Sequence, residues 1–182
     1  MKVLIFVALL VAAGCGHATR IITTPDSKES EQRLLRQTFS RGSNDDYTSG
    51  KFSDPLVGAL TVTSAYGVRR AGNRVHEGVD LRAAPHTKVK AINSGKIVLI
   101  AKLLREGLMV VVDHGRSIFS VYMHLSEVLV KKDEIVKNSQ TIARSGDTGK
   151  GVTGPHLHLG VRVDGGYVDP LLFIKISNKY KK

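Results

Sequence analysis

The stretch Val89-Lys-Ala-Ile-Asn-Ser-Gly-Lys-Ile-Val-Leu-Ile-Ala101 decides the fold of this chain. It is rich in β-branched and aliphatic residues, and the Ser94-Gly95 pair interrupts it with residues that favour a turn. We therefore predict two strands that bend at Ser94-Gly95. No segment between residue 52 and the end of the chain has a long, clean helical periodicity.

Three further runs extend this β pattern along the chain. Residues 108–112 predict a buried strand that ends at Asp113-His-Gly115, and residues 117–123 predict another. A third strand is expected over 156–163, closed by the turn at 164–166. The predicted fold class is mainly β: an antiparallel β-sheet domain with few or no helices.

Composition and charge narrow the class of protein. The 182 residues are 42% hydrophobic and include one cysteine, which excludes a disulfide framework and a multi-cysteine zinc or iron–sulfur site. The net charge is +11, of which residues 51–182 carry +10 (21 basic against 11 acidic). Such a surplus indicates a polyanionic partner: nucleic acid, a membrane surface or a cell-wall polymer. Nucleic acid is disfavoured because tryptophan is absent and only 5% of residues are aromatic, which leaves few stacking platforms.

The amino end has the pattern of a secretory signal. Lys2 precedes an apolar run, Val3 to Ala13, that is much shorter than the about 20 residues of a membrane-spanning helix. Small residues before Cys15 resemble the lipobox of bacterial lipoproteins, in which the signal is cut just before a cysteine that becomes lipidated. Cleavage after Ala18 is the alternative and would give a soluble secreted protein.

These features predict four segments: a signal peptide over 1–14, a lipidation site and flexible linker over 15–50, the β domain over 51–175 and a basic tail over 176–182. Residues 16–50 are polar and read as a tether. Within them, Glu29 to Phe39 favours a short helical turn but lacks a sustained apolar stripe. We expect the protein in the cell envelope, lipid-anchored in the periplasm or outer membrane, and otherwise secreted.

Four of the seven histidines form a chemically meaningful pattern. His76-Glu-Gly-Val-Asp80 places a carboxylate four residues after an imidazole, and strand alternation sends both rings of His156-Leu-His158 to one face. His76, Asp80 and one of the paired histidines would give a catalytic zinc ion three ligands and leave its fourth position open. His124, in Tyr122-Met-His-Leu-Ser126, supplies a further imidazole for proton transfer.

The sequence motifs around these residues resemble those of the lysostaphin/LytM-type zinc endopeptidases that cut peptidoglycan peptides. The phrases that match that family are His76-Glu-Gly-Val-Asp-Leu81, Tyr122-Met-His-Leu-Ser126, Thr153-Gly-Pro-His-Leu-His158, Thr63-Ser-Ala-Tyr-Gly-Val-Arg69 and Val168-Asp-Pro170. The resemblance covers about residues 52–172, nearly the whole predicted domain.

The resemblance implies a role for each residue. His76, Asp80 and His158 become the ligands of one Zn²⁺ per chain, and His124 and His156 become the catalytic histidines. Which of the two is the general base stays open. Peptidoglycan is the implied partner, a D-Ala–diaminopimelate cross-link the first expected substrate and a glycine bridge the alternative. We expect a monomer.

Some positions depart from the family pattern. The phrase His86-Thr-Lys-Val89 replaces a usual Gly-Thr-Pro-Val, and Asp133 stands where glycine is common. The short loop between Val68 and His76 is expected to leave the cleft open on that side. Tyr66 is interpreted as a core aromatic, with oxyanion stabilisation as the alternative, and His114 as a turn residue.

The sequence therefore predicts a zinc-dependent endopeptidase that hydrolyses peptide bonds in peptidoglycan and acts in cell-wall remodelling. The alternative is a non-enzymatic regulator of the same family, which binds peptidoglycan or activates an amidase. Such regulators have usually lost ligand or catalytic residues, and all five key positions are present in this chain.

Overall fold

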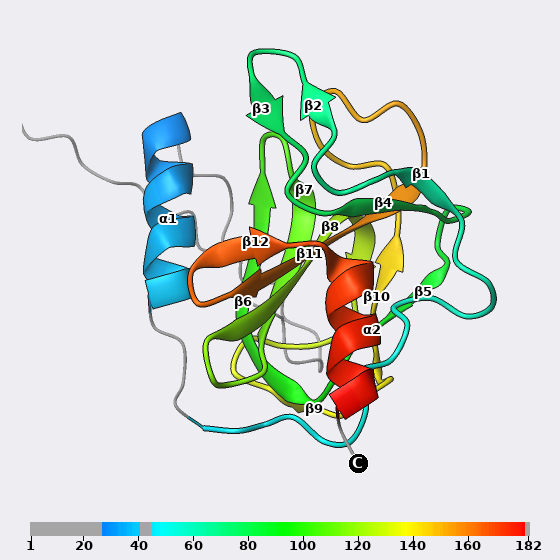
Figure 1. Cartoon of the computed structure of the whole chain (residues 1–182). Helices are drawn as coiled ribbons and strands as arrows, with labels where there is room; N and C mark the ends of the chain where they lie inside the picture. The colour runs from blue at the N-terminus through cyan, green and yellow to red at the C-terminus, as the bar shows by residue number, and fades with distance from the viewer. Residues whose placement is uncertain (1–26, 41–44, 181–182) are drawn as a thin grey trace, which may run out of the picture.

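The computed structural model describes residues 27–40 and 45–180, and the regular structure in this part of the chain is mainly antiparallel β-strand (Figure 1). Ten of its strands form one sheet: β1 (Val62–Ser64), β4 (Val79–Arg82), β5 (Lys88–Lys90), β6 (Gly95–Leu103), β7 (Gly107–Asp113), β8 (Ile118–Val128), β9 (Ile135–Val136), β10 (Thr141–Ser145), β11 (His156–Val163) and β12 (Gly166–Val168). A separate hairpin contains β2 (Arg69–Arg70) and β3 (Arg74–Val75). The predicted antiparallel, mainly β fold is confirmed.

The main path through the sheet is β1-β4-β11-β8-β7-β6-β9. Strand β10 pairs with both β5 and β8, and β12 pairs with β11. The long strand β8 lies between β11 and β7, so it carries its residues to the middle of the sheet. The predicted bend at Ser94-Gly95 falls at the start of β6, whose first residue is Gly95.

Apolar side chains fill both faces of the central strands. Along β7, Val110 and Val112 belong to a first core, whereas Met109 and Val111 belong to a second core. Because side chains alternate along a strand, the two cores lie on opposite faces of β7. Burial on both faces explains why the sequence of β7 is a continuous apolar run instead of an alternating one.

The helix α1 (Lys28–Ser40) occupies part of the segment that was expected to be a flexible linker. Its start is capped by Ser27, whose hydroxyl accepts a hydrogen bond from the Ser30 amide at 3.2 Å. Its side chains Leu34, Leu35 and Phe39 pack against the second core. This interface supplies the apolar face that the sequence pattern understated, since short helices depend on tertiary packing.

The helix α2 (Pro170–Tyr180) was not predicted, and it includes residues that were assigned to a basic tail. The Asp169 carboxylate accepts hydrogen bonds from the amides of Leu171 and Leu172 at 3.0 and 3.1 Å. An aspartate cap followed by proline at the first helical position is a helix-start signal, and that signal was overlooked. Asn178 then joins the helix to Phe52 through two hydrogen bonds between its side-chain amide and the Phe52 backbone.

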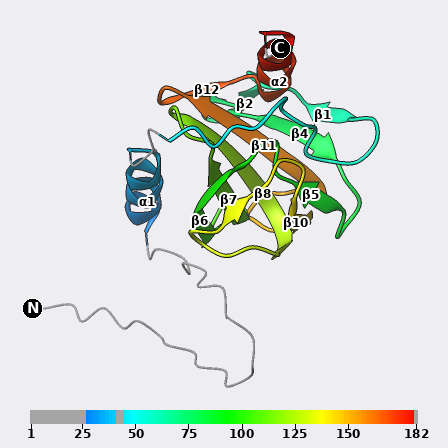
Figure 2. The ribbon, with the colours of Figure 1, turned by 90° about the horizontal axis from the view of Figure 1, so that it is seen from below.

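The two helices lie at separate places around the sheet, as the view from below shows (Figure 2). Within residues 27–40 and 45–180, neither helix has the length and apolar character needed to span a bilayer. The predicted signal peptide and Cys15 lie outside the described residues.

Candidate metal centre

Three of the predicted site residues come together where β4 meets β11. The backbone register pairs Asp80 of β4 with His158 of β11, and His76 lies four residues before Asp80. All three side chains belong to buried residues, with exposed fractions of 6% for His76 and 8% for Asp80 and His158. Pairing of two strands thus joins residues that are 78 positions apart in sequence.

The potential ligand atoms of these residues converge on one point. His76 Nε2 lies 3.0 Å from Asp80 Oδ1 and 3.1 Å from His158 Nδ1, and the last two atoms are 2.8 Å apart. Tetrahedral zinc with ligands at about 2.0–2.2 Å requires its donors to lie a little over 3 Å apart. Two imidazole nitrogens and one carboxylate oxygen therefore form a donor set of the kind and spacing that suit one zinc-sized ion.

Hydrogen bonds and burial favour the protonation states of these side chains that can bind a cation. His76 Nδ1 is 2.7 Å from the Ala65 carbonyl oxygen, and only an N–H can donate to a carbonyl, so His76 Nε2 carries a lone pair. Burial lowers the pKa of His158 and favours its neutral ring. Burial would raise the pKa of Asp80, but the adjacent His158, His76 and Arg70 side chains hold that pKa well below its usual range. The cluster is thus prepared for a cation.

The structure shows why residue 78, between His76 and Asp80, is a glycine. A Cβ at this position would lie 2.5 Å from both His158 Nε2 and the Leu159 carbonyl oxygen. Such contacts are too short for any side chain, so the His158 ring can occupy its place only because residue 78 has none.

His124 lies beside this cluster at an irregular point of β8. The β7–β8 register shifts between Leu108 and Val110, and His124 has a positive φ of 63°. A bulge of this kind redirects a side chain. The His124 Nδ1–H donates to the Thr148 carbonyl at 3.0 Å, which leaves Nε2 unprotonated. Burial, followed by the nearby His158 and His156, lowers the pKa of His124 to about 4.

His156 completes the group of four imidazoles. Its ring centroid is 4.8 Å from that of His124, and its Nδ1–H donates to the Gly154 carbonyl at 2.8 Å. Its Nε2 lies 3.8 Å from Asp80 Oδ1, farther than the atoms of the three-donor cluster. The structure thus brings together all five of the predicted site residues, three as a potential ligand set and two beside it.

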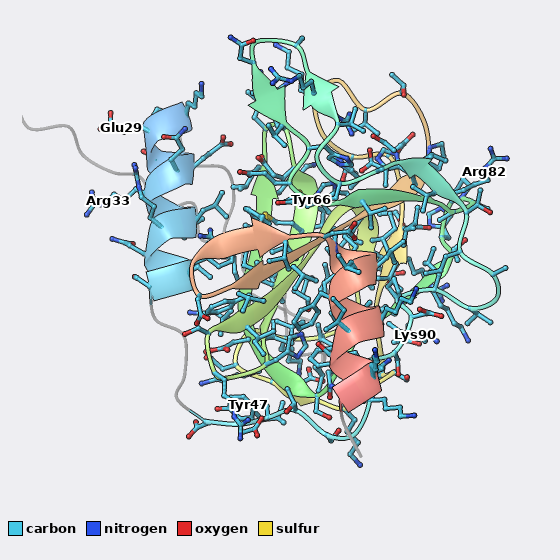
Figure 3. All side chains as sticks on the ribbon, in the orientation of Figure 1. Glu29, Arg33, Tyr47, Tyr66, Arg82 and Lys90 are labelled. Carbon is cyan, nitrogen blue, oxygen red and sulfur yellow. The ribbon has the colours of Figure 1, made fainter. Side chains whose placement is uncertain are left out.

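A cleft of about 670 Å³ opens over these residues. Its walls come from distant parts of the chain: the β2–β3 hairpin, the β6–β7 turn, the segment before β11, and α1, which contributes Leu35. Glu29 and Arg33 of α1 point away from the sheet (Figure 3). The face of α1 that carries Leu35 is therefore the one that helps to form the cleft.

Comparison with known proteins places this site in a family. The sequence pattern of Peptidase family M23 matches residues 74–170, more than half of the chain. The chain belongs to peptidase family M23. The matched range contains all five residues of the site, whereas α1 lies before it.

Curated relatives of this M23 chain carry names of peptidases and of an activator. An uncharacterized metalloprotease of Haemophilus influenzae is 42% identical over 99 residues, which is 54% of this chain and 21% of that protein. The peptidoglycan DD-endopeptidase ShyB of Vibrio cholerae is 36% identical over 53% of this chain and 22% of its own length. The murein hydrolase activator EnvC of Escherichia coli is 33% identical over 85% of this chain and 35% of its own length. The chain thus spans about a fifth to a third of these relatives.

Solved structures give the same family likeness. A peptidase M23 from Pseudomonas aeruginosa matches with a TM-score of 0.69 and 32% identity, over 82% of this chain and 62% of that one. A zinc-containing peptidase from Vibrio cholerae matches with a TM-score of 0.63 and 31% identity, over 67% of this chain and 39% of that one. The catalytic domain of lysostaphin from Staphylococcus simulans matches with a TM-score of 0.60 and 35% identity, over 64% of this chain and 92% of that one.

The M23 cleft differs from expectation on the side of the Val68–His76 loop. This loop was expected to leave the cleft open, but it forms the β2–β3 hairpin, and Arg70, Arg74 and Val75 line the cleft there. Tyr66 does not point a free hydroxyl at the site, because its OH donates to the Tyr167 carbonyl at 2.8 Å. A short loop can still form a wall when its two arms pair with each other.

His114 has a larger structural role than a turn residue. It is fully buried, its Nδ1–H donates to the Ser94 carbonyl at 2.7 Å, and its Nε2 lies 2.8 Å from the Ser120 hydroxyl. Ser120 in turn donates to Tyr122 OH, which accepts the Ile92 amide hydrogen bond. This network joins the segment between β5 and β6 to β8 inside the core, and its residues are not among those that line the cleft.

Sequence reasoning missed two polar residues that contact the candidate metal ligands His76 and Asp80. Arg70 donates to Asp80 Oδ2 at 2.8 Å and to the Ser64 hydroxyl at 3.0 Å. Ser64 Oγ is 3.3 Å from His76 Nδ1. Their position in the sequence was the available signal: Ser64 lies within the family phrase Thr63 to Arg69, and Arg70 follows it directly.

Proposed function

We propose that this M23 chain is a zinc-dependent endopeptidase that hydrolyses peptide bonds in peptidoglycan cross-links or stem peptides. The observation that carries the proposal is the convergence of three potential ligand atoms, with two further imidazoles beside them, in the lining of one cleft. The relatives named as peptidoglycan DD-endopeptidases and the zinc-containing structural neighbour support it.

In this proposal, His76, Asp80 and His158 hold the zinc ion. When bound, zinc polarises a carbonyl and makes a water molecule more acidic, which is the chemistry that peptide hydrolysis needs. The protein holds His124 and His156 with their Nδ1–H groups on backbone carbonyls, so each presents an unprotonated Nε2. These nitrogens accept a proton from the attacking water and return one to the departing amine. The lowered pKa of His124 keeps it ready as an acceptor at neutral pH.

Metal analysis and wall digestion test this function together. The purified chain is expected to bind one zinc per molecule and to release soluble fragments from purified peptidoglycan, with activity lost to a chelator and restored by zinc. His158→Ala should lose both metal and activity, and His124→Ala should keep the metal and lose activity. His86→Ala is the control, because the His86 side chain contacts the Ser126 hydroxyl and lies outside the lining of the cleft. Full activity of His158→Ala would contradict the proposal.

A regulator of an amidase is the second candidate, and the alignment to EnvC over 85% of the chain favours it. A regulator would leave peptidoglycan intact when alone and would increase release by an added amidase. The bond that is cut separates the two functions, because an amidase removes whole peptides from the sugar whereas an endopeptidase leaves cut peptides. We favour the endopeptidase because all five site residues are present and correctly grouped.

We further propose that Cys15 anchors the chain to an envelope membrane, with the basic domain facing the cell wall as a monomer. The support is the apolar run and small residues before Cys15 and the +10 charge of residues 51–182. Cys15→Ser should move the protein from the membrane fraction to the soluble fraction. Continued membrane association of that variant would contradict the anchor.

A further inference from the structure

Arg70 occupies the outer oxygen of the Asp80 carboxylate. One guanidinium nitrogen, Nη2, lies 2.8 Å from Asp80 Oδ2, while the other carboxylate oxygen, Oδ1, faces His76 and His158 at 3.0 and 2.8 Å. The two oxygens therefore have separate tasks. Charge-assisted hydrogen bonds of this length are among the stronger ones in proteins, and this carboxylate is largely buried, with 11% of its side chain exposed.

The same guanidinium group is also connected, through the Ser64 hydroxyl, to His76. Arg70 Nη2 donates to Ser64 Oγ at 3.0 Å, and Ser64 Oγ lies 3.3 Å from His76 Nδ1. Ser64 is on β1 and Arg70 is on β2, so neither belongs to the strands that carry the cluster. Groups that hydrogen-bond to metal ligands orient those ligands, and losing one typically costs about ten- to a hundredfold in metal affinity.

We propose that Arg70 is a positioning residue that restricts Asp80 to one-oxygen binding of the metal and, with Ser64, fixes the orientation of His76. If Oδ2 were free, the carboxylate could turn and offer both oxygens to the ion. That would fill the position that a catalytic zinc site leaves for water or substrate. The inference rests on the proposed zinc function and adds a role for a residue outside the five that were predicted.

The charge of Arg70 acts against its positioning role, so the experiment must separate the two. Removing a cation near a bound metal ion removes repulsion, which by itself would tighten binding. Arg74 offers a matched control on the same hairpin: it is exposed, lines the same cleft, and its Nε donates to the hairpin's own Ala71 carbonyl. Arg74→Ala therefore removes a similar charge without touching Asp80.

The test measures the zinc dissociation constant by competition with a chelating dye and the visible absorption spectrum of the cobalt-substituted protein. We expect Arg70→Ala to weaken zinc binding by about ten- to a hundredfold. Its cobalt spectrum should lose intensity, as happens when coordination number rises above four. Arg70→Lys should fall between Arg70→Ala and wild type, and Arg74→Ala should match wild type in both measurements.

Unchanged zinc affinity and an unchanged cobalt spectrum in Arg70→Ala would overturn the inference. Because 40% of the Arg70 side chain is exposed, its loss should not prevent folding, and circular dichroism of each variant checks this. If Arg70→Ala does not fold, Arg70→Lys decides alone, and identity with wild type in both measurements overturns the inference. Failure of the proposed function is a separate result, because it is measured on the wild-type protein, which would then bind no stoichiometric zinc or would leave peptidoglycan uncut.

Discussion

Gly78 is the residue on which the packing of the metal cluster depends most directly. Its missing side chain leaves room for the His158 ring, and an added methyl group would lie 2.5 Å from His158 Nε2. Gly78→Ala should therefore displace His158 and abolish stoichiometric zinc binding, with a loss of stability of about 1–3 kcal/mol from overpacking. Metal content after dialysis and a urea unfolding curve measure the two effects.

Gly166→Ala is the matched control for this substitution. A Cβ at residue 166 would meet nothing closer than the Val163 carbonyl oxygen at 3.9 Å, and Gly166 does not have a positive φ. This variant should retain zinc and stability. If Gly78→Ala binds zinc as well as Gly166→Ala does, the close packing of residue 78 against His158 has no functional weight.

Tyr122 predicts how stability changes at high pH. Burial raises the pKa of its hydroxyl to about 12, from an ordinary value of 10.0. Between these two values the unfolded chain loses the proton and the folded chain keeps it, so the free energy of unfolding falls as pH rises from 10 to 12. The contribution of one such group approaches about 1.4 kcal/mol per pH unit within that window.

Urea unfolding of wild type and Tyr122→Phe at several pH values isolates this contribution. The variant loses the hydrogen bond that its hydroxyl accepts from the Ile92 amide, so it should be less stable at neutral pH. Its free energy of unfolding should nevertheless decline less steeply above pH 10 than that of wild type. Parallel curves for the two proteins would show that Tyr122 does not titrate as its burial requires.

Individual site residues could be predicted from the sequence when a local spacing encoded their geometry. His76 with Asp80, and His156 with His158, are close in sequence, and strand alternation orients the second pair. Arg70 and Ser64 could not be predicted, because they reach the cluster from other strands and through hydrogen bonds that have no spacing rule. The left-handed φ values of His86 and Asp133, 61° and 68°, agree with the glycines usual at these positions in the resembled family.

Helix α1 is the element for which the sequence-based prediction and the structure differ most. Its Phe39 ring meets Phe119 edge-on at 5.4 Å, and the Arg162 guanidinium stacks over the Phe39 ring at 4.1 Å. The Glu31 carboxylate also accepts a hydrogen bond from the Leu104 amide at 2.8 Å. A pattern within residues 28–40 could not reveal these contacts, since their partners lie on β8, on β11 and in the turn after β6.

Phe39→Ala should loosen α1 from the sheet. The half-buried ring contributes packing that we expect to be worth about 2 kcal/mol, roughly half of the cost of removing a phenylalanine from a core. Amide hydrogen exchange over residues 28–40, and at the Leu104 amide, should become faster. Arg33→Ala, whose side chain points away from the sheet in Figure 3, should leave this exchange unchanged. Equal exchange in both variants would mean that α1 is not held by Phe39.

Strands β6, β7, β8 and β11 were predictable because each contains a β-type run that lies next to a glycine turn. Helix α2 was missed for a different reason than α1. Its local start signal, Asp169 before Pro170, was present in the sequence but was used only as part of the family phrase Val168-Asp-Pro170. Capping by a carboxylate is a short-range effect, so attention to it would have placed the helix correctly.

For the whole molecule, charge should govern contact with the cell wall. Residues 51–182 carry a net charge of +10, so attraction to an anionic polymer should weaken as salt screens it. Co-sedimentation with purified peptidoglycan should fall when sodium chloride rises from about 0.05 to about 0.5 M, which shortens the screening length roughly threefold. Binding that does not change over this range would show that the basic surface is not what holds the wall.

We propose that the clustered histidines and Asp80 make this M23 chain a peptidoglycan endopeptidase. Digestion of a defined cross-linked muropeptide dimer, with products identified by mass, tests it most directly. The zinc-loaded chain should convert the dimer to two monomers with the gain of one water, and chelation or His158→Ala should prevent this. A chain that holds one zinc ion yet leaves the dimer intact, or that cuts it equally well in the presence of a chelator, would contradict the claim.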